Sequence, residues 1–322
     1  MQLHLIWRIC KYDSGNHLKA ILHVRKLIKK YKPDIIYCHS SKAGAIGRIA
    51  DLGIRNKIIY NPHGWAFNME CGNKKKMLYR WIERFLACFT NCIIAISDYE
   101  KESAVANCIC KPEKIQVIYN GIDLDFYAKE ITDCSVTRAD LGISGDAYVI
   151  GFVGRLSKQK SPDVFIKAAA KIKKRIPQAY FLMVGNGEER EQTEQLITEL
   201  GLWDCVHITG WVDNPMGYVM LFDQAMLLSR WEGFGLVLAE FMWAKKPVVA
   251  TRVDAIPNLV SDGMNGLLVE KDDVDAVVAA AVRIYEDKRL AEQLCEKGKQ
   301  VVLERFFIKR VVEEHERLFA GL

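Results

Sequence analysis

The chain lacks the sequence patterns of several common protein classes. No window reaches the run of about 18 apolar residues that a membrane-spanning helix needs. No C-x-x-C pair occurs among the ten cysteines, which disfavours a structural zinc site. The opening MQLHLIWRIC lacks the apolar core and cleavage site of a secretory signal, and GNG at 185–187 is not the G-x-G-x-x-G of dinucleotide-binding enzymes. These absences favour a protein of the reducing cytoplasm and disfavour a nucleotide-dependent dehydrogenase.

The composition that remains is that of a globular protein with about two domains. The 322 residues are 50% hydrophobic and 26% charged, with no low-complexity tract or short repeat. Charge is distributed unevenly: residues 1–130 hold 21 Lys+Arg against 12 Asp+Glu, a net +9, and the remainder holds 24 against 28, a net −4. A basic half can meet nucleic acid, anionic lipid or an anionic substrate, and composition alone leaves all three open.

Ten short β-branched runs alternate with longer helical patterns. They lie at 34–38, 57–61, 91–97 and 115–120 and, after a polar stretch near 128–146, at 148–154, 179–185, 206–210, 225–229, 247–251 and 266–270. Such alternation is typical of parallel βαβ units. We therefore predict an α/β protein of two doubly wound, Rossmann-like domains facing a cleft. Ligands are expected outside the carboxyl ends of the strands.

Two of these carboxyl ends carry side chains suited to an anion. The loop GRLSKQK, after the strand that ends at Val153, offers Gly154, Arg155, Lys158 and Lys160, and we expect Ser161 to cap the next helix. Cations before a helix N-terminus form an anion site, although solvated loop charge is an equal alternative for this motif alone.

The stretch SRWEGFGLVLAE, residues 229–240, follows another strand. Its Gly-Phe-Gly bend brings bare backbone close to a ligand, and Glu232 lies beside the bend. Glu240 is the only polar side chain from 235 to 244, so it needs a partner inside a buried helix. A nucleotide sugar has phosphates for the N–H groups and hydroxyls for the carboxylates. The alternative is that Glu240 pairs with Arg230 or Arg252.

Taken together, the motifs resemble a known enzyme family. The E-x7-E spacing from Glu232 to Glu240, the GRLSKQK loop, NGID at 120–123 and PHG at 62–64 resemble the retaining glycosyltransferases of the GT-B fold. HSSKAGAIGRIA at 39–50 and NPHGWAFN at 61–68 are similar to bacterial transferases that build capsular or exopolysaccharide repeat units.

The resemblance implies a role for each matched residue. Arg155 and Lys160 would bind the donor diphosphate beside Gly154, and Glu240 would bind the ribose. Glu232 would hold the transferred sugar together with the backbone of Gly233, Phe234 and Gly235. His63 would reach toward the reacting centre, and Asn120 would lie where the first domain passes into the second. The reaction would retain anomeric configuration and would need neither a metal nor another cofactor beyond the nucleotide-sugar donor.

The same resemblance sets the domain boundaries and the biological setting. It implies an acceptor-side domain at 1–130, a donor-binding domain at 131–303 and a returning helix at 304–322. The partners would be a nucleotide sugar, with UDP as the family's commonest nucleotide, and a lipid-linked saccharide, with no nucleic acid. The protein would then lie in the cytoplasm, at the inner face of the plasma membrane.

Two departures from the family pattern leave alternatives open. Ser161 stands where the family usually has glycine. The family's first strand and glycine-rich loop are not seen before MQLHLIWRIC, so the first domain is expected to be incomplete. An inactive nucleotide-sugar-binding subunit or fragment is therefore an alternative, and a sugar-nucleotide epimerase on the same fold is a further one.

A basic amphipathic segment lies at 72–89, GNKKKMLYRWIERFLACF. Apolar residues recur there at helical spacing, and we expect the basic residues on the other side: Lys74, Lys75, Lys76, Arg80 and Arg84. A helix of this kind can lie on an anionic bilayer. The equal alternative is that the apolar stripe packs on the first sheet.

Overall fold

The structure is a computed structural model that describes residues 17–54, 56–69, 71–134 and 136–322. The features expected in MQLHLIWRIC lie outside these residues. The chain divides into two compact units, one formed by residues up to Tyr119 together with Glu313–Leu322 and the other by Asn120–Val312. The predicted boundaries at 130 and 303, and the cleft between the domains, stay predictions.

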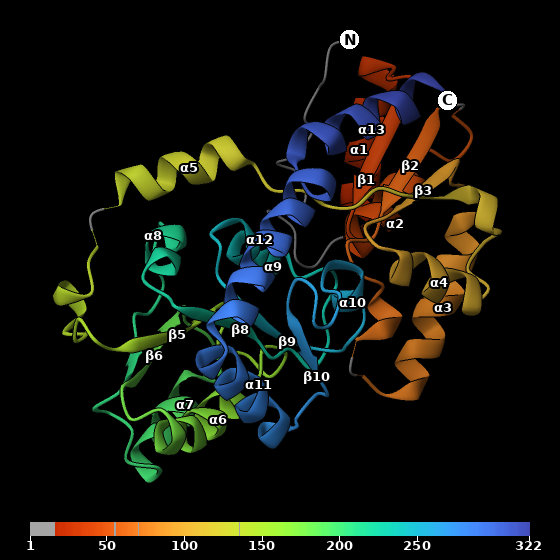
Figure 1. The fold of residues 1–322 in the computed structure, drawn as a ribbon. Helices are drawn as coiled ribbons and strands as arrows, with labels where there is room; N and C mark the ends of the chain where they lie inside the picture. The colour runs from red at the N-terminus through yellow and green to blue at the C-terminus, as the bar shows by residue number, and fades with distance from the viewer. Residues whose placement is uncertain (1–16, 55, 70, 135) are drawn as a thin grey trace. The chain divides into compact units, whose positions relative to one another are not determined.

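The first unit contains a parallel sheet whose strand order follows the chain (Figure 1). Its strands are β1 (Ile35–His39), β2 (Lys57–Asn61), β3 (Cys92–Ala95) and β4 (Ile115–Val117). Its helices are α1 (His17–Tyr31), α2 (Ser41–Ala50), α3 (Asn73–Ala87) and α4 (Asp98–Ala106), with 3-10 turns at Ala66–Asn68 and Pro112–Lys114. The end of α13 (Ile308–Ala320) belongs to the same unit.

A buried ion pair joins α2 to α3 in this unit. Arg48 donates to Glu83 at 3.0 Å, and their side chains are 0% and 5% exposed. The Tyr60 hydroxyl donates to the other Glu83 oxygen at 3.0 Å, and the Arg48 guanidinium lies 3.8 Å from the centre of the Tyr60 ring. Breaking a pair buried to this extent typically costs about 3–5 kcal/mol, so it fixes which face of α3 turns inward.

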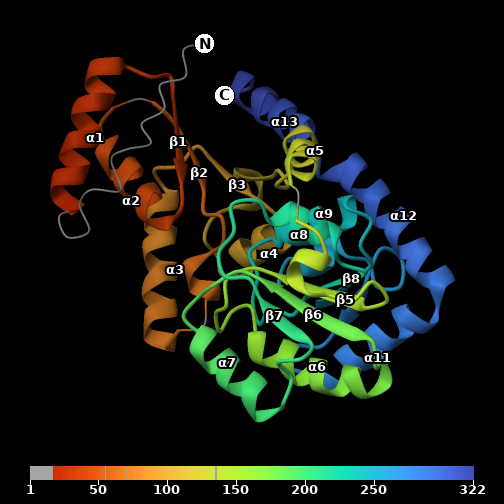
Figure 2. The same cartoon turned by 90° about the vertical axis from the view of Figure 1, so that its left-hand side faces the viewer.

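The second unit contains a six-stranded parallel sheet in the order β7-β6-β5-β8-β9-β10 (Figure 2). The strands are β5 (Tyr148–Val153), β6 (Ala179–Val184), β7 (Val206–Ile208), β8 (Gln224–Leu227), β9 (Val248–Thr251) and β10 (Leu267–Val269). This order is the 3-2-1-4-5-6 order of a Rossmann sheet, and it reverses direction between β5 and β8. The predicted α/β class with two parallel, Rossmann-like sheets is confirmed.

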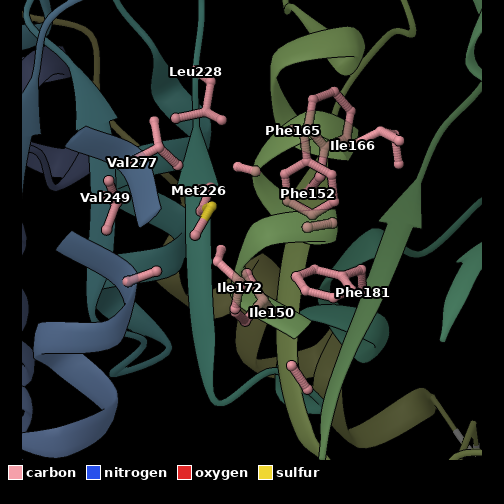
Figure 3. Packing of buried hydrophobic residues seen from close by; sticks show 14 of the residues in the cluster. Ile150, Phe152, Phe165, Ile166, Ile172, Phe181, Met226, Leu228, Val249 and Val277 are labelled. Atoms are coloured by element: carbon pink, nitrogen blue, oxygen red, sulfur yellow. The ribbon is translucent and has the colours of Figure 1, made fainter. Parts of the chain in front are cut away.

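Helices cover both faces of the second sheet. One face carries α6 (Pro162–Arg175), α7 (Arg190–Glu199) and α11 (Val274–Glu286), and the other carries α8 (Pro215–Met220), α9 (Leu236–Trp243) and α12 (Lys288–Arg305). The short elements are η3 (Ala139–Leu141) and α10 (Ile256–Leu259). Figure 3 shows Phe152, Phe165 and Phe181 packed between the sheet and α6, together with aliphatic side chains from β8 and α11.

Each predicted strand is found and starts within one residue of its expected start. Several end two or three residues early, because the last residues turn into the loops that carry the motifs.

The predicted final helix from 304 begins instead at Ile308. The reason is that Phe306 and Phe307 leave the helix to pair with Ile122: the Ile122 N–H donates to the Phe306 carbonyl at 2.7 Å. A Cβ at Gly121 would lie 2.9 Å from that carbonyl, so glycine permits the close approach. The segment that enters the second unit, just before α5 (Leu124–Asp133), therefore pairs with a segment near its end.

Ser161 does not cap α6 as expected. It occupies the N-cap position, but its side chain makes no capping bond, and its buried hydroxyl has no partner in the described part of the chain. Its φ of 54° lies in the left-handed region that favours glycine. The position therefore needs a residue that tolerates positive φ, and the capping rule does not apply to it.

We predict that Ser161→Gly stabilises the protein, by up to about 1 kcal/mol, because it relieves a left-handed conformation that costs about 1–2 kcal/mol for a residue with a Cβ. Urea unfolding checks this. Ser97→Gly is the matched control, since Ser97 does cap its helix, accepting from the Glu100 N–H at 3.1 Å, and should lose stability. Equal losses in the two variants would contradict the interpretation.

Candidate functional site

The loops after β5 and β8 meet where the second sheet reverses its strand order. Lys160, from the first loop, forms an ion pair with the Oε2 atom of Glu232, from the second. The two side chains are 17% and 11% exposed, so the pair is largely shielded from water. In sheets of this kind, ligands bind outside this reversal point.

Glu232 is held at several points. The Ser229 hydroxyl donates to the same Oε2 atom at 3.0 Å, and the Glu232 N–H donates to Asp254 at 2.8 Å. In the residues that the structure describes, the other carboxylate oxygen, Oε1, accepts no hydrogen bond. The site therefore fixes the carboxylate through one oxygen and leaves the other for a ligand donor.

Arg230, in the loop after β8, forms hydrogen bonds and ion pairs that hold this loop against the loop after β5. Its guanidinium donates to Asp163 at 3.0 Å, to Asp272 at 2.7 Å and to the Lys158 carbonyl at 3.0 Å. Arg252 pairs with Asp262 and Glu270. Neither arginine pairs with Glu240, so the alternative that Glu240 is neutralised by Arg230 or Arg252 is wrong.

Glu240 instead accepts a hydrogen bond from Tyr127 on α5. The distance from the Tyr127 hydroxyl to Oε1 is 2.6 Å. Burial raises the pKa of Glu240, the bond from Tyr127 lowers it, Glu130 raises it, and the positive charge of Lys160 lowers it. The charge of Lys160 therefore acts on Glu240 as well as on its ion-pair partner Glu232.

The bend before α9 has the expected backbone character. Gly235 stands at the N-cap of α9 with φ 84°, a conformation that favours glycine. The Phe234 side chain is 3% exposed and packs edge-on against Phe306 at 5.7 Å. Phe234 can therefore meet a ligand through its backbone but not through its side chain. Gly233 and Gly235 likewise offer only backbone, and all three lie at a helix N-terminus, which favours anions.

Glycines also bring the neighbouring loops together. Gly154 has φ 154°, and a Cβ on Gly185 would lie 2.0 Å from the Gly154 carbonyl. Arg155 follows Gly154, is exposed and takes part in no ion pair or hydrogen bond within the described residues. It is therefore an available cation in the same loop as Lys160, five positions before it.

In the first unit, His63 lies in the loop after β2 and stacks on His39, the last residue of β1. The His39 Nδ1 and His63 Nε2 atoms are 2.7 Å apart, and the ring centres are 5.1 Å apart. His63 has φ 51°, and its N–H donates to the Asn61 side chain at 3.0 Å. On the same face of the sheet, the Tyr37 hydroxyl lies 3.1 Å from the His315 Nε2 atom.

The two imidazoles favour the neutral form. Burial lowers the pKa of His63 to about 4, with further lowering by His39 and His315, and burial also lowers the pKa of His39. Asn120, the other predicted residue near the unit boundary, is half-buried, and no hydrogen bond of its side chain is found among the described residues.

Three neighbours of these residues were missed in the sequence: Tyr127, His39 and Asp254. His39 opens the motif HSSKAGAIGRIA and ends a predicted strand, which is a usable signal. Tyr127 is 113 positions from Glu240 and Asp254 is 22 from Glu232, so no local pattern points to either.

The predicted amphipathic segment forms α3, but its apolar stripe is not covered by the sheet. We call the exposed residues Met77 (67%), Leu78 (52%), Trp81 (63%) and Phe85 (51%) the α3 ridge. Of the predicted stripe, Leu86 is buried and Ile82 is half-buried. The packing alternative is therefore wrong for the ridge.

The basic residues of α3 are also placed differently from the prediction. Lys74, Lys75 and Arg84 are exposed along with the ridge, whereas Arg80 turns inward, with its guanidinium 5.9 Å from the centre of the Phe67 ring. Cationic and apolar side chains thus share the outer surface of this helix.

Among the described residues, no helix is long and apolar enough to cross a membrane, and no group of three or more His, Cys, Asp or Glu residues is placed to hold a metal ion.

The histidine pair generates a pH prediction. The folded-state pKa of His63, about 4, lies below the ordinary value of 6.5, so protons bind preferentially to the unfolded chain. The neutral ring's contribution to stability is full above pH 6.5 and is lost as pH falls toward 4. Wild type should therefore lose its stability advantage over His63→Asn across this window in urea unfolding, because asparagine tolerates positive φ and does not titrate. A constant difference from pH 7 to pH 4 would contradict the depressed pKa.

Comparisons with known proteins agree with this architecture. The family model described as Glycosyl transferases group 1 matches residues 135–301, and the one described as Glycosyltransferase Family 4 matches residues 2–126. The UDP-Gal:alpha-D-GlcNAc-diphosphoundecaprenol alpha-1,3-galactosyltransferase of Escherichia coli is 32% identical over 277 residues, which are 85% of this chain and 72% of that relative.

A capsular polysaccharide biosynthesis glycosyltransferase, CapM of Staphylococcus aureus, is 28% identical over 312 residues, covering 94% of this chain and 80% of the relative. Among solved structures, HepE of Anabaena in complex with UDP-glucose matches with a TM-score of 0.83 and 25% identity, covering 94% of this chain and 82% of that one. The chain therefore belongs to the glycosyl transferases group 1 family, with the GT-B fold that the sequence motifs predict.

Proposed function

We propose that the protein is a retaining glycosyltransferase that moves a hexosyl group from a nucleotide sugar, UDP-linked, to a lipid-linked saccharide in capsular or exopolysaccharide synthesis. The observation that carries this proposal is the Lys160–Glu232 pair at the reversal point of the second sheet, with Glu240 close by on α9. The names of two relatives add support, because one uses UDP-Gal with a diphosphoundecaprenol-linked acceptor and the other acts in capsule synthesis.

In this proposal each part of the donor meets a matching group of the second unit. The diphosphate lies by Arg155, Lys160 and the N-terminus of α9, where cations and free N–H groups favour anions. The ribose hydroxyls donate to Glu240, and the sugar hydroxyls donate to the open oxygen of Glu232. The fixed positions of the two carboxylates then orient the donor before the acceptor arrives.

The chemistry follows from where charge develops. The bond between the sugar's anomeric carbon and the diphosphate oxygen breaks, and the acceptor oxygen bonds to that carbon on the same face. The acceptor proton passes to the departing diphosphate. Arg155 and Lys160 stabilise the charge on the leaving group, which is the main task of the protein in such a step, and in this proposal no metal or further cofactor is required.

The α3 ridge suits a lipid-linked acceptor. Its exposed Trp81 and Phe85 rings stack at 5.9 Å, and Lys74, Lys75 and Arg84 are exposed on the same helix. Aromatic residues beside cations bind the interface of an anionic bilayer, each cation adding about 1 kcal/mol. We propose that this surface holds the protein at the cytoplasmic face of the membrane.

Arg155→Ala and Lys160→Ala should each lower kcat by about a hundredfold, because each removes positive charge from the departing diphosphate. The measurement is transfer from a panel of nucleotide hexoses to a lipid-linked saccharide. Lys167→Ala is the matched control, since Lys167 is an exposed cation on α6 whose one ion pair among the described residues is with Asp163, and it should leave kcat unchanged.

Other outcomes would replace the proposal with its alternatives. Donor binding without transfer in the wild type would indicate a nucleotide-sugar-binding subunit. An altered sugar nucleotide formed without an acceptor would indicate an epimerase. Wild-type turnover in both variants would refute the phosphate assignment.

For the membrane contact, the protein should co-sediment with vesicles that contain anionic phosphatidylglycerol and should be released by high salt. The triple variant Lys74→Glu, Lys75→Glu, Lys76→Glu should lose at least tenfold in binding, at about 1 kcal/mol per cation. The control with the same charge change, Lys271→Glu, Lys288→Glu, Lys297→Glu, carries its substitutions on exposed residues of the second unit and should bind as wild type. Equal sedimentation with neutral vesicles would count against an electrostatic contact.

A further inference from the structure

The carboxylate of Glu240 has one satisfied and one open oxygen. Oε1 accepts from the Tyr127 hydroxyl at 2.6 Å, and Oε2 accepts no hydrogen bond from the residues that the structure describes. An ionised carboxylate has about four acceptor positions, so a protein donor on one oxygen leaves room for ligand hydroxyls on the other.

Tyr127 is held in this position by its neighbours. Its ring centre lies 6.2 Å from that of Trp243 at the end of α9, and 5.6 Å from that of Phe126. The carbonyl of Glu130, one turn further along α5, accepts a hydrogen bond from the Asn214 side chain at 2.5 Å, which ties α5 to the start of α8. The phenol is therefore carried by a helix that is itself anchored in the second unit.

We propose that Tyr127 is a positioning residue of the donor site: its hydroxyl holds Glu240 in place and in the ionised form, so that the free carboxylate oxygen can accept the ribose hydroxyls. The inference rests on the proposed function, because it takes the ribose as the ligand of Glu240. A hydrogen bond to a carboxylate is stronger when the carboxylate is charged, so the phenol favours the form that binds the ligand best.

The surroundings of Glu240 favour its protonated form, so the hydrogen bond from Tyr127 is needed to keep it ionised. Burial raises the pKa of Glu240, and Glu130 on α5 raises it further. Tyr127 and the more distant Lys160 lower it. Burial, followed by the charges of Glu240, Glu130 and Asp123, raises the pKa of Tyr127, which keeps the phenol protonated and able to donate. Without the phenol, Lys160 is the one remaining group of the described chain that lowers the pKa of Glu240.

The experiment measures the affinity of the full-length protein for UDP by calorimetry between pH 5 and pH 8. Tyr127→Phe should weaken binding about tenfold at pH 7, because one charge-assisted bond to Glu240 is lost. Since that bond lowers the pKa of Glu240, its removal should move the acidic loss of affinity to higher pH. A residue that only supported the fold would lower affinity without moving this pH profile.

Tyr148→Phe is the matched control. It removes the same hydroxyl from a tyrosine of the same unit, where the hydroxyl donates to Gln224 at 3.1 Å, at the start of β5 and away from its carboxyl end. Its UDP affinity and pH profile should equal those of the wild type.

Glu240→Gln distinguishes the positioning role of Tyr127 from the ribose-binding role of Glu240. If it weakens UDP binding and flattens the acidic limb while Tyr127→Phe behaves as wild type, the role of Tyr127 is refuted and the ribose role of Glu240 stands. If Glu240→Gln itself binds UDP as wild type, the ribose assignment is refuted and the inference with it. A tenfold loss and a shifted profile in Tyr127→Phe, with weakened binding in Glu240→Gln and an unchanged Tyr148→Phe control, support the inference.

Discussion

The ion pair between Lys160 and Glu232 joins the loop after β5 to the loop after β8, at the point where the second sheet reverses its strand order. The candidate donor site is arranged around this pair. Two largely buried charges are stable only when they are paired and further hydrogen-bonded. Here Ser229 bonds the carboxylate, Asp254 fixes its backbone, and Arg230 braces the loops. These contacts hold a cation and a carboxylate at fixed positions without using all of their hydrogen-bond donors and acceptors. A charged ligand that is rich in hydroxyl groups would bind to the remaining ones.

The apolar helix α9 places a second constraint on the site. Its side chains Leu238, Phe241 and Met242 are fully buried, so the helix cannot rotate to move the half-buried Glu240 further into water. The carboxylate is compensated by the Tyr127 hydroxyl rather than by an arginine. A neutral donor offsets part of the desolvation and leaves the negative charge in place, whereas a bidentate arginine would have occupied both oxygens. A phenol therefore preserves the carboxylate as an acceptor for a ligand.

The parts of the fold that depend on local patterns were predictable, and the parts that depend on distant contacts were not. Alternating β-branched and helical runs located all ten strands of the described residues, and the motif order predicted the family. The Tyr127–Glu240 contact spans 113 positions, so no window of sequence contains it. Ser161 was misjudged for a different reason: serine is a good cap only at negative φ, and the loop that carries Lys160 forces φ to 54°. The sequence contains the residues of the site but not the backbone angles and long-range donors that set their roles.

The orientation of α3 shows how a buried charge can decide what a surface exposes. From its pattern alone, the helix could equally bury its aromatic stripe against the sheet or expose it to a bilayer. Instead Glu83 turns inward, because Arg48 on α2 and the Tyr60 hydroxyl on β2 both bond to it. Turning Trp81 and Phe85 inward would rotate Glu83 away from Arg48 and leave a guanidinium that is 0% exposed without its counter-ion, a loss larger than the gain from burying two rings. The exposed ridge is therefore a consequence of the buried ion pair, and its apolar surface is retained on the outside by the fold itself.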